Sequence, residues 1–290
     1  MTKEEFKNLC NKTVLLDGAT GSYLMAAGMP KGTSSELWIM EHPEVLIQLQ
    51  KDYVAAGSQI IYAPTFGANR VNLAKHKSAD DIIRINETLI SYSKEAVGQS
   101  AYIAGDITTS GEMMEPYGDF TYEDAYALYK EQISILAGGG VDMIVAETMF
   151  SIDEILAALD AANSVCTLPV MCSLTVEADG SIFTGGNVID ASLALEAAGA
   201  DAVGINCSVG PDQLEAVVRS IRKSVNIPVI AKPNAGMPQI SASGLAVYDM
   251  NSDDFALHLM TLVDAGATLI GGCCGTTPEY IQKIAAQLGS

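Results

Sequence analysis

The chain has 290 residues, 49% of them hydrophobic and 18% charged, a composition typical of a compact folded protein and unlike that of a disordered one. Its 35 acidic residues outnumber 16 basic ones and give a net charge of −19, which argues against binding to nucleic acid. No apolar run reaches the roughly 20 residues that a membrane span requires. The first residues indicate a short helix at about 2–11 and lack the apolar core of a signal peptide, which predicts a cytoplasmic protein.

Eight short apolar segments of strand character follow one another along the chain. They lie at residues 14–17, 59–62, 101–106, 143–146, 170–175, 202–205, 229–232 and 269–272. Helical patterns separate them, at residues 43–56, 80–97, 122–137, 152–162, 191–198, 211–222, 253–264 and 278–288. This alternation predicts an α/β protein, a single (β/α)8 TIM barrel over residues 1–290. A doubly wound open sheet is the alternative, but no G-x-G-x-x-G turn follows any strand.

One pattern occurs four times in this series. A helix ends on a glycine and a buried strand follows, and the glycines are Gly57, Gly140, Gly199 and Gly266. Seven or eight residues after each glycine, at the far end of the strand, stand Thr65, Glu147, Cys207, and the pair Cys273 and Cys274. Because the active site of such a barrel is built at the C-terminal ends of its strands, we expect these side chains to share one mouth.

The most informative local feature is the pair of adjacent cysteines within residues 271–278 (GGCCGTTP). Successive side chains of a strand point to opposite faces, and the flanking glycines allow the backbone to turn both thiols toward one atom. Cys207 ends a strand near the same mouth. Three converging thiolates suit Zn²⁺ with one open coordination position, the pattern of a catalytic zinc. A redox-active dithiol, which needs a strained ring between adjacent cysteines, and an inert buried pair are the alternatives.

A zinc ion held by three thiolates favours one kind of chemistry. The site carries a formal charge of −1, so it is poorly suited to making hydroxide. It suits a ligand that is itself a thiol, because coordination removes the thiol proton and leaves a nucleophilic thiolate. The expected reaction is attack of a bound thiolate on an activated methyl group.

Five segments, in order along the chain, resemble the homocysteine S-methyltransferase family, and most of all the homocysteine-binding barrels of its cobalamin-dependent methionine synthases. They are residues 17–22 (DGATGS), 65–70 (TFGANR), 204–211 (GINCSVGP), 232–236 (KPNAG) and 271–278. The resemblance implies Zn²⁺ held by Cys207, Cys273 and Cys274, with the thiolate of homocysteine as the fourth ligand.

The resemblance also assigns residues to the amino-acid end of the substrate. Those it implies in substrate binding are Asp17, Gly18, Ser22, Thr65, Glu147 and Asn234. Glu147 and Asp17 resemble the carboxylates that receive the homocysteine ammonium, and the backbone amides of residues 18–22 suit its carboxylate. Asn234 corresponds to a polar group beside the metal, and with Glu147 and the three cysteines it forms the expected catalytic set. The alternative for Asp17 and Asn234 is an ordinary turn residue, and for Glu147 a strand end.

Two segments depart from the family pattern. Ala63 and Pro64 stand where the family commonly has Thr-Asn, and proline offers neither a backbone N–H nor an amide side chain. Thr108 and Thr109 stand in a turn where the family has glycine and proline. Both changes fall on the barrel mouth, where they bear on which thiol is accepted.

The expected methyl donor is a methyl-corrinoid. Gly275, directly after the cysteine pair, resembles the methionine-synthase type, whereas the S-methylmethionine-dependent type usually has arginine there. The sequence has no Asp-x-His-x-x-Gly corrinoid motif, so we expect the corrinoid on a separate protein that docks over the mouth. A small donor, S-methylmethionine or a betaine, is the alternative, and a non-catalytic module that binds zinc or a thiol is an alternative of another class.

Overall fold

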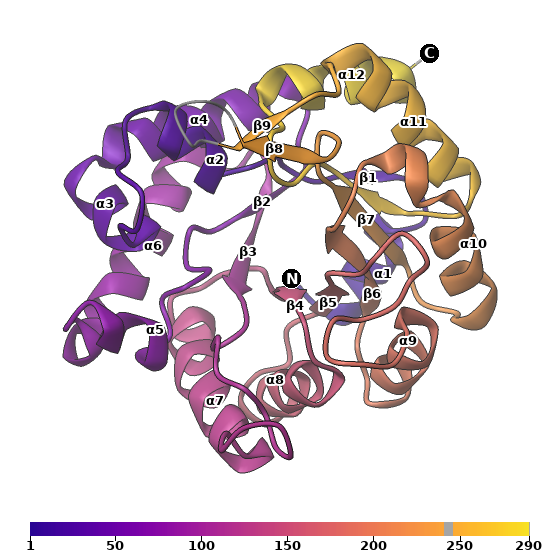
Figure 1. Ribbon diagram of the computed structural model, residues 1–290. Helices are drawn as coiled ribbons and strands as arrows, with labels where there is room; N and C mark the ends of the chain where they lie inside the picture. Colours follow the sequence, from indigo (N-terminus) through magenta and orange to yellow (C-terminus); the bar gives the residue numbers. More distant parts are fainter. Residues whose placement is uncertain (241–245, 290) are drawn as a thin grey trace.

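The computed structural model describes residues 1–240 and 246–289, which form a ring of parallel strands surrounded by helices (Figure 1). The eight strands of the ring are β1 (Val14–Leu15), β2 (Ile60–Tyr62), β3 (Tyr102–Ile107), β4 (Met143–Met149), β5 (Val170–Leu174), β6 (Ala202–Cys207), β7 (Val229–Pro233) and β10 (Leu269–Ile270). Each strand pairs in parallel with the one before it in the ring, in the order β1-β10-β7-β6-β5-β4-β3-β2. The predicted TIM barrel is confirmed.

Helices alternate with these strands as predicted. The eight that cover the barrel are α4 (Pro43–Ala56), α6 (Ile82–Val97), α7 (Tyr122–Gly138), α8 (Ile152–Val165), α9 (Val188–Ala197), α10 (Glu215–Ser224), α11 (Ser252–Asp264) and α12 (Pro278–Leu288). The four glycines of the repeated pattern all have positive φ, as a left-handed helix end requires. None of the helices in the described ranges is long and apolar enough to cross a membrane.

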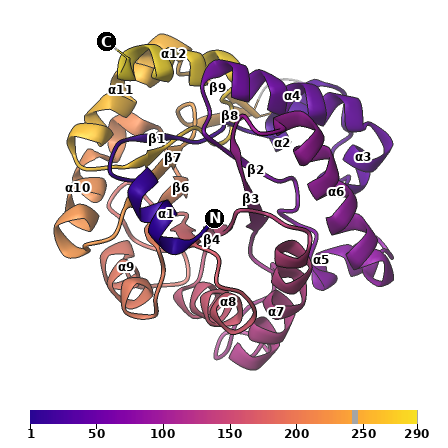
Figure 2. The ribbon, with the colours of Figure 1, turned by 180° about the vertical axis from the view of Figure 1, so that it is seen from behind.

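Several short elements were not predicted. They are the helices α2 (Gly21–Ala26), α3 (Ser35–Glu41) and α5 (Arg70–Lys75), and a separate antiparallel pair of strands, β8 (Pro238–Ile240) and β9 (Ala246–Tyr248). The helix expected at about 2–11 is α1 (Lys3–Leu9), whose N-terminus is closed by a capping box between Thr2 and Glu5. Figure 2 shows α1 lying across one end of the barrel.

The interior of the barrel is apolar at the end that α1 covers. Phe6 of α1 is buried and belongs to one cluster with the inward-facing strand residues Val14, Leu16, Ile60, Ala104, Met143, Val145, Met171, Ala202, Ile230 and Leu269. This apolar cluster fills one end of the barrel, so polar side chains can gather at the opposite end, where the strands finish.

The ring is closed between β1 and β2 by individual hydrogen bonds, since no strand ladder joins these two strands. The backbone N–H of Gln59 donates to the carbonyl of Leu15 at 2.7 Å, and the hydroxyl of Ser58 donates to the carbonyl of Leu16 at 3.0 Å. Farther along, the backbone N–H of Tyr62 donates to a carboxylate oxygen of Asp17 at 2.8 Å. A side chain of the predicted site therefore takes part in closing the barrel.

Candidate metal centre and substrate cavity

Cys207, Cys273 and Cys274 converge at the C-terminal end of the strands. Their three Sγ atoms lie within 4.8 Å of one another, and Sγ of Cys207 lies 3.8 Å from Sγ of Cys274. A tetrahedral zinc with Zn–S bonds of about 2.3 Å separates its sulfur ligands by about 3.8 Å. A disulfide needs about 2.05 Å, and all six cysteines are free. The cluster has the ligand type and spacing of a zinc site.

An unusual backbone conformation aims Cys207 at the other two thiols. Cys207 and Ser208 have φ of 57° and 65°, a left-handed conformation that residues other than glycine seldom adopt. The turn is held by Asn234, whose side-chain amide donates to the carbonyl of Ser208 at 2.9 Å. The backbone N–H of Cys273 donates to the carbonyl of Pro233 at 2.7 Å. The end of β7 thus fixes both parts of the cluster.

The three thiols differ in how readily they lose a proton. Hydrogen bonds from Cys207 and Cys273 lower the pKa of Cys274, so one thiolate forms readily. Hydrogen bonds with Cys273 and Cys274, together with burial, raise the pKa of Cys207. A cation with affinity for sulfur is needed to displace the remaining protons, since thiolates this close repel one another.

A cavity of about 220 Å³ opens beside the cysteines. Its wall is formed by the turn after β1, the ends of β2, β3, β4 and β7, and α3; the residues lining it include Asp17, Gly18, Ser22, Tyr62, Pro64, Asp106, Glu147, Thr148, Lys232 and the three cysteines. The hydroxyl of Ser22 accepts a hydrogen bond from the backbone N–H of Gly275 at 3.1 Å, which joins the first turn to the cysteine turn. The cysteine cluster and the cavity form one site.

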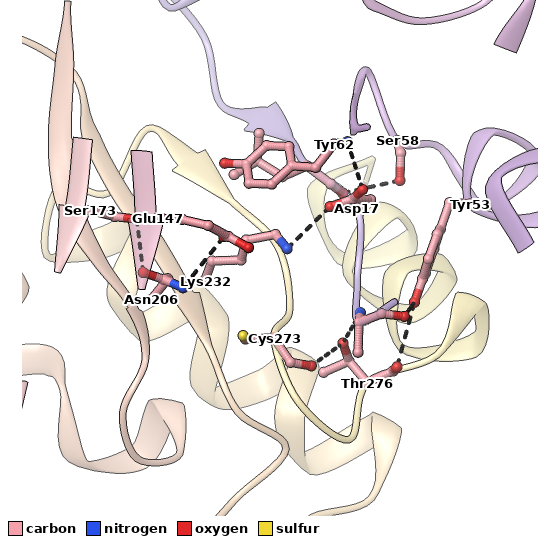
Figure 3. A network of polar contacts seen from close by, with 12 residues as sticks. Asp17, Tyr53, Ser58, Tyr62, Glu147, Ser173, Asn206, Lys232, Cys273 and Thr276 are labelled. Carbon is pink, nitrogen blue, oxygen red and sulfur yellow. Dashed lines mark hydrogen bonds and ion pairs between the residues drawn. The ribbon is translucent and has the colours of Figure 1, made fainter. Parts of the chain in front are cut away.

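Five charged side chains are buried in the wall of this cavity: Asp17, Asp106, Glu147, Lys232 and Glu36. Asp17, Glu147 and Lys232 are labelled in Figure 3. Nζ of Lys232 lies 3.1 Å from Oδ1 of Asp17 and 4.6 Å from the centre of the Tyr62 ring. Burial acts to lower the pKa of Lys232, but the carboxylates of Asp17 and Glu147 raise it well above its usual value. The lysine is therefore charged.

The carboxyl groups respond to burial in the opposite direction. Burial raises the pKa of Glu147 from 4.5 to about 8, against the lowering effect of Lys232. Burial and the neighbouring Glu147 raise the pKa of Asp106 well above its usual range. Burial also raises the pKa of Asp17, although Lys232 and the backbone N–H of Tyr62 favour its charged form. One cation thus stands among three carboxyl groups that resist ionisation.

Asn206 holds Glu147 and the residue that follows it. Its Oδ1 accepts from the backbone N–H of Thr148 and from the hydroxyl of Ser173, both at 2.8 Å. Its Nδ2 donates to the hydroxyl of Thr148 at 2.7 Å and reaches Oε2 of Glu147 at 3.4 Å. These contacts, visible in part in Figure 3, fix Glu147 at the end of β4, and among the described residues its carboxyl group has no other hydrogen bond.

Most of the predicted site residues line the cavity, but two do not. Thr65 is fully buried in the barrel wall, where its hydroxyl donates to the carbonyl of Asp106 at 2.8 Å. Asn234 supports the turn that carries Cys207 instead of facing the cavity. Of the two departures from the family pattern, Pro64 lines the cavity and Thr109 does not.

Three residues of the wall were assigned no role from the sequence: Tyr62, Asp106 and Lys232. A signal for the two charged ones exists, because each stands at the end of an otherwise apolar strand segment, AYIAGD and VIAK. A charged residue is rarely buried in a strand without a partner or a role.

Comparisons with known proteins find similarity over nearly the whole chain. The family model described as Homocysteine S-methyltransferase matches residues 14–288. The methionine synthase of Mycobacterium leprae is 29% identical in an alignment 298 positions long, gaps included, which covers 97% of this chain and 24% of that protein. That of Mycobacterium tuberculosis is 29% identical in an alignment of 300 positions, which covers 97% of this chain and 25% of that protein. The chain spans about a quarter of the length of these relatives.

A solved structure shares the architecture. The metallated form of the homocysteine methyltransferase MmuM from Escherichia coli superposes with a TM-score of 0.79 over 95% of this chain and 96% of that chain, at 21% identity. Its oxidised form gives the same TM-score, 0.79, at 22% identity. These similarities show a common fold.

Proposed function

Because the chain belongs to the homocysteine S-methyltransferase family, we propose that it methylates the thiol of homocysteine to give methionine, at a zinc ion held by Cys207, Cys273 and Cys274. The observation that carries the proposal is the convergence of three Sγ atoms, within 4.8 Å of one another, on the wall of a cavity lined by buried carboxyl groups. The thiolates suit the metal, and the carboxyl groups suit an amino-acid ligand.

Each part of the site has a distinct task in this proposal. Zinc, when bound, lowers the pKa of the substrate thiol and keeps it as a thiolate at neutral pH. Glu147 offers a carboxylate to the substrate ammonium, and Asn206 orients Glu147. The backbone amides of residues 18–22 lie on the cavity wall beside the cysteines, where they can contact the substrate carboxylate. Asn234 keeps Cys207 in place.

We propose a methyl-corrinoid carried by a separate protein as the donor. Support comes from large apolar side chains that are exposed on loops following the strand ends: Met113 and Tyr117 after β3, Phe183 after β5, and Met237 after β7. Loops at this end of the barrel surround the cavity, and exposed apolar groups gathered there suit a protein partner.

A comparison of four donors tests the assignment. One preparation of the zinc-loaded protein is assayed for methionine formation from homocysteine with methylcobalamin, a methylated corrinoid protein, S-methylmethionine and glycine betaine. The proposal expects the highest rate with the corrinoid protein. Highest activity with S-methylmethionine or betaine would contradict the proposed corrinoid donor and would still support homocysteine as the acceptor. Inactivity with all four rejects homocysteine methylation and favours a non-catalytic module that binds zinc or a thiol.

A further inference from the structure

Lys232 is a buried cation that has no role in the reaction proposed above. Its side chain is 4% exposed, and it enters the cavity wall from β7. Among the described residues that line this cavity it is the one basic side chain, facing Asp17, Asp106 and Glu147. Burying a lysine is costly unless the charge is compensated, so a lysine in a ligand cavity calls for an explanation.

Asp17 is already occupied by groups of the protein. Its Oδ2 accepts the backbone N–H of Tyr62 at 2.8 Å, and its Oδ1, which makes no other polar contact, lies 3.1 Å from Nζ of Lys232. A substrate ammonium placed beside Asp17 would meet the ammonium of Lys232 in the same buried space, where like charges repel strongly. The protein itself supplies the cation for Asp17.

Lys232 keeps hydrogen-bonding capacity for a ligand. An ammonium group has three N–H donors, and the described residues give it one carboxylate, Asp17, and one ring face, Tyr62. Among the described residues, Oδ1 of Asp106 is buried without a hydrogen-bond partner, and the carboxyl group of Glu147 has only the 3.4 Å contact with Asn206. The wall therefore offers one positive group and two incompletely bonded carboxyl groups, the complement of a zwitterion.

We propose that Lys232 binds the carboxylate of the acceptor thiol and that Asp17 is the positioning residue that holds Lys232. The inference rests on the proposed function, because it names the group of homocysteine that this lysine recognises. Glu147 and Asp106 then receive the ammonium, and the carboxylate gains a charged partner in addition to the backbone amides of residues 18–22. Lys232 becomes the residue that selects thiols with a carboxylate.

Three thiols separate the two ends of the ligand. They are homocysteine, 3-aminopropane-1-thiol, which lacks the carboxylate, and 4-mercaptobutanoate, which lacks the ammonium. Their binding to the zinc-loaded full chain is measured by titration calorimetry, without any methyl donor. We expect the parent to bind 3-aminopropane-1-thiol about 10- to 100-fold more weakly than homocysteine, the range for a charged hydrogen bond. K232M should lose most of that preference, by binding homocysteine more weakly and 3-aminopropane-1-thiol unchanged, while the backbone amides of residues 18–22 keep the remainder.

Two further variants test whether the effect of K232M comes from the lost contact with the substrate carboxylate. K232M leaves Asp17 without its cation, which can impair folding, and D17N/K232M removes both charges together. The double variant should show the same loss of preference for a carboxylate. E147Q acts at the other end: it should weaken homocysteine and 3-aminopropane-1-thiol and leave 4-mercaptobutanoate unchanged.

Two results would overturn the inference alone. One is a parent that binds homocysteine and 3-aminopropane-1-thiol equally well. The other is an equal loss for both of these thiols in K232M and in D17N/K232M, which would make Lys232 a structural residue. If the parent protein binds none of the three thiols, the proposed function itself is contradicted, and this outcome is distinguishable from the other two.

Discussion

The side-chain amide of Asn234 donates to the carbonyl oxygen of Ser208 at 2.9 Å, and this bond holds the left-handed turn that places Cys207 in the metal cluster. Since Asn234 does not line the cavity, we expect it to act by positioning Cys207 as a ligand of the proposed zinc. N234A should therefore lower zinc affinity about 10- to 100-fold, as loss of a residue supporting metal ligands usually does. Competition with a chelator measures this. The exposed Asn226→Ala is the control, and unchanged zinc affinity in N234A would refute the positioning role.

The three cysteines are expected to act as one unit in metal binding. Replacing Cys207, Cys273 or Cys274 singly by serine removes a soft thiolate from a set of three, so each variant should lose most of its zinc at neutral pH. Zinc is measured by elemental analysis after dialysis against a weak chelator. Cys166→Ser, a free cysteine outside the cluster, should keep the parent's zinc content. A variant of the cluster that retains one zinc per chain shows that the changed cysteine is not a ligand.

Glu147 should make the stability of the metal-free protein depend on pH. Burial raises its folded pKa to about 8 from 4.5, so the folded state holds a proton that the unfolded state releases above pH 4.5. Its contribution to stability is complete below pH about 4.5 and is lost as the pH rises through about 8. E147Q has no such pH-dependent loss. As the pH rises over this range, the free energy of unfolding of the parent should therefore fall relative to that of E147Q by up to about 4 kcal/mol.

Urea denaturation at pH 5, 6, 7 and 8 measures that difference. The exposed Glu123→Gln serves as the control and should run parallel to the parent. A constant offset between the parent and E147Q at all four pH values would show that Glu147 titrates near its ordinary value.

Gly204 should tolerate no side chain. A Cβ built on it would lie 2.1 Å from the backbone oxygen of Ile230 on the neighbouring strand β7, and a backbone atom in a closed barrel has little room to move. We expect G204A to lower the free energy of unfolding by about 3 kcal/mol or more. Gly138→Ala, whose Cβ meets nothing within 4 Å, is the matched control. Thermal and urea unfolding compare the two, and equal stability of both variants would contradict the expected clash.

The barrel was predictable because its signals are local. Glycines at helix ends, apolar strands and amphipathic helices each depend on a few neighbouring residues, and Gly57 and Gly266 show the positive φ that the pattern requires. The convergence of Cys207 with Cys273 and Cys274 followed from one further rule, that strand ends of a barrel share a face. The short helices α2 and α3 were missed because six or seven residues carry too little periodicity to be recognised.

The cavity wall was harder to predict because it depends on where individual side chains point. Lys232 and Asp17 are 215 positions apart, and no sequence pattern links them before the ring closes. Thr65 stands at the expected strand end, yet its hydroxyl turns to the carbonyl of Asp106 within the wall. Whether a residue after the last strand position faces inward is decided by the turn that follows, and not by the alternation of the strand.

Asp17 bonds to β2 where the ring of strands lacks a ladder, and the same carboxylate lies in the cavity wall. Asp17 thus both joins β1 to β2 and lines the cavity. A drop in activity on changing Asp17 therefore does not by itself reveal a contact with substrate, because the contact between the two strands is lost as well. The side chains of Ser58 and Gln59 join the same two strands from outside the cavity, by bonds to the carbonyl of Leu16 and the backbone N–H of Leu15. Variants of these two residues show how much of any loss of activity comes from weakening the contact between β1 and β2.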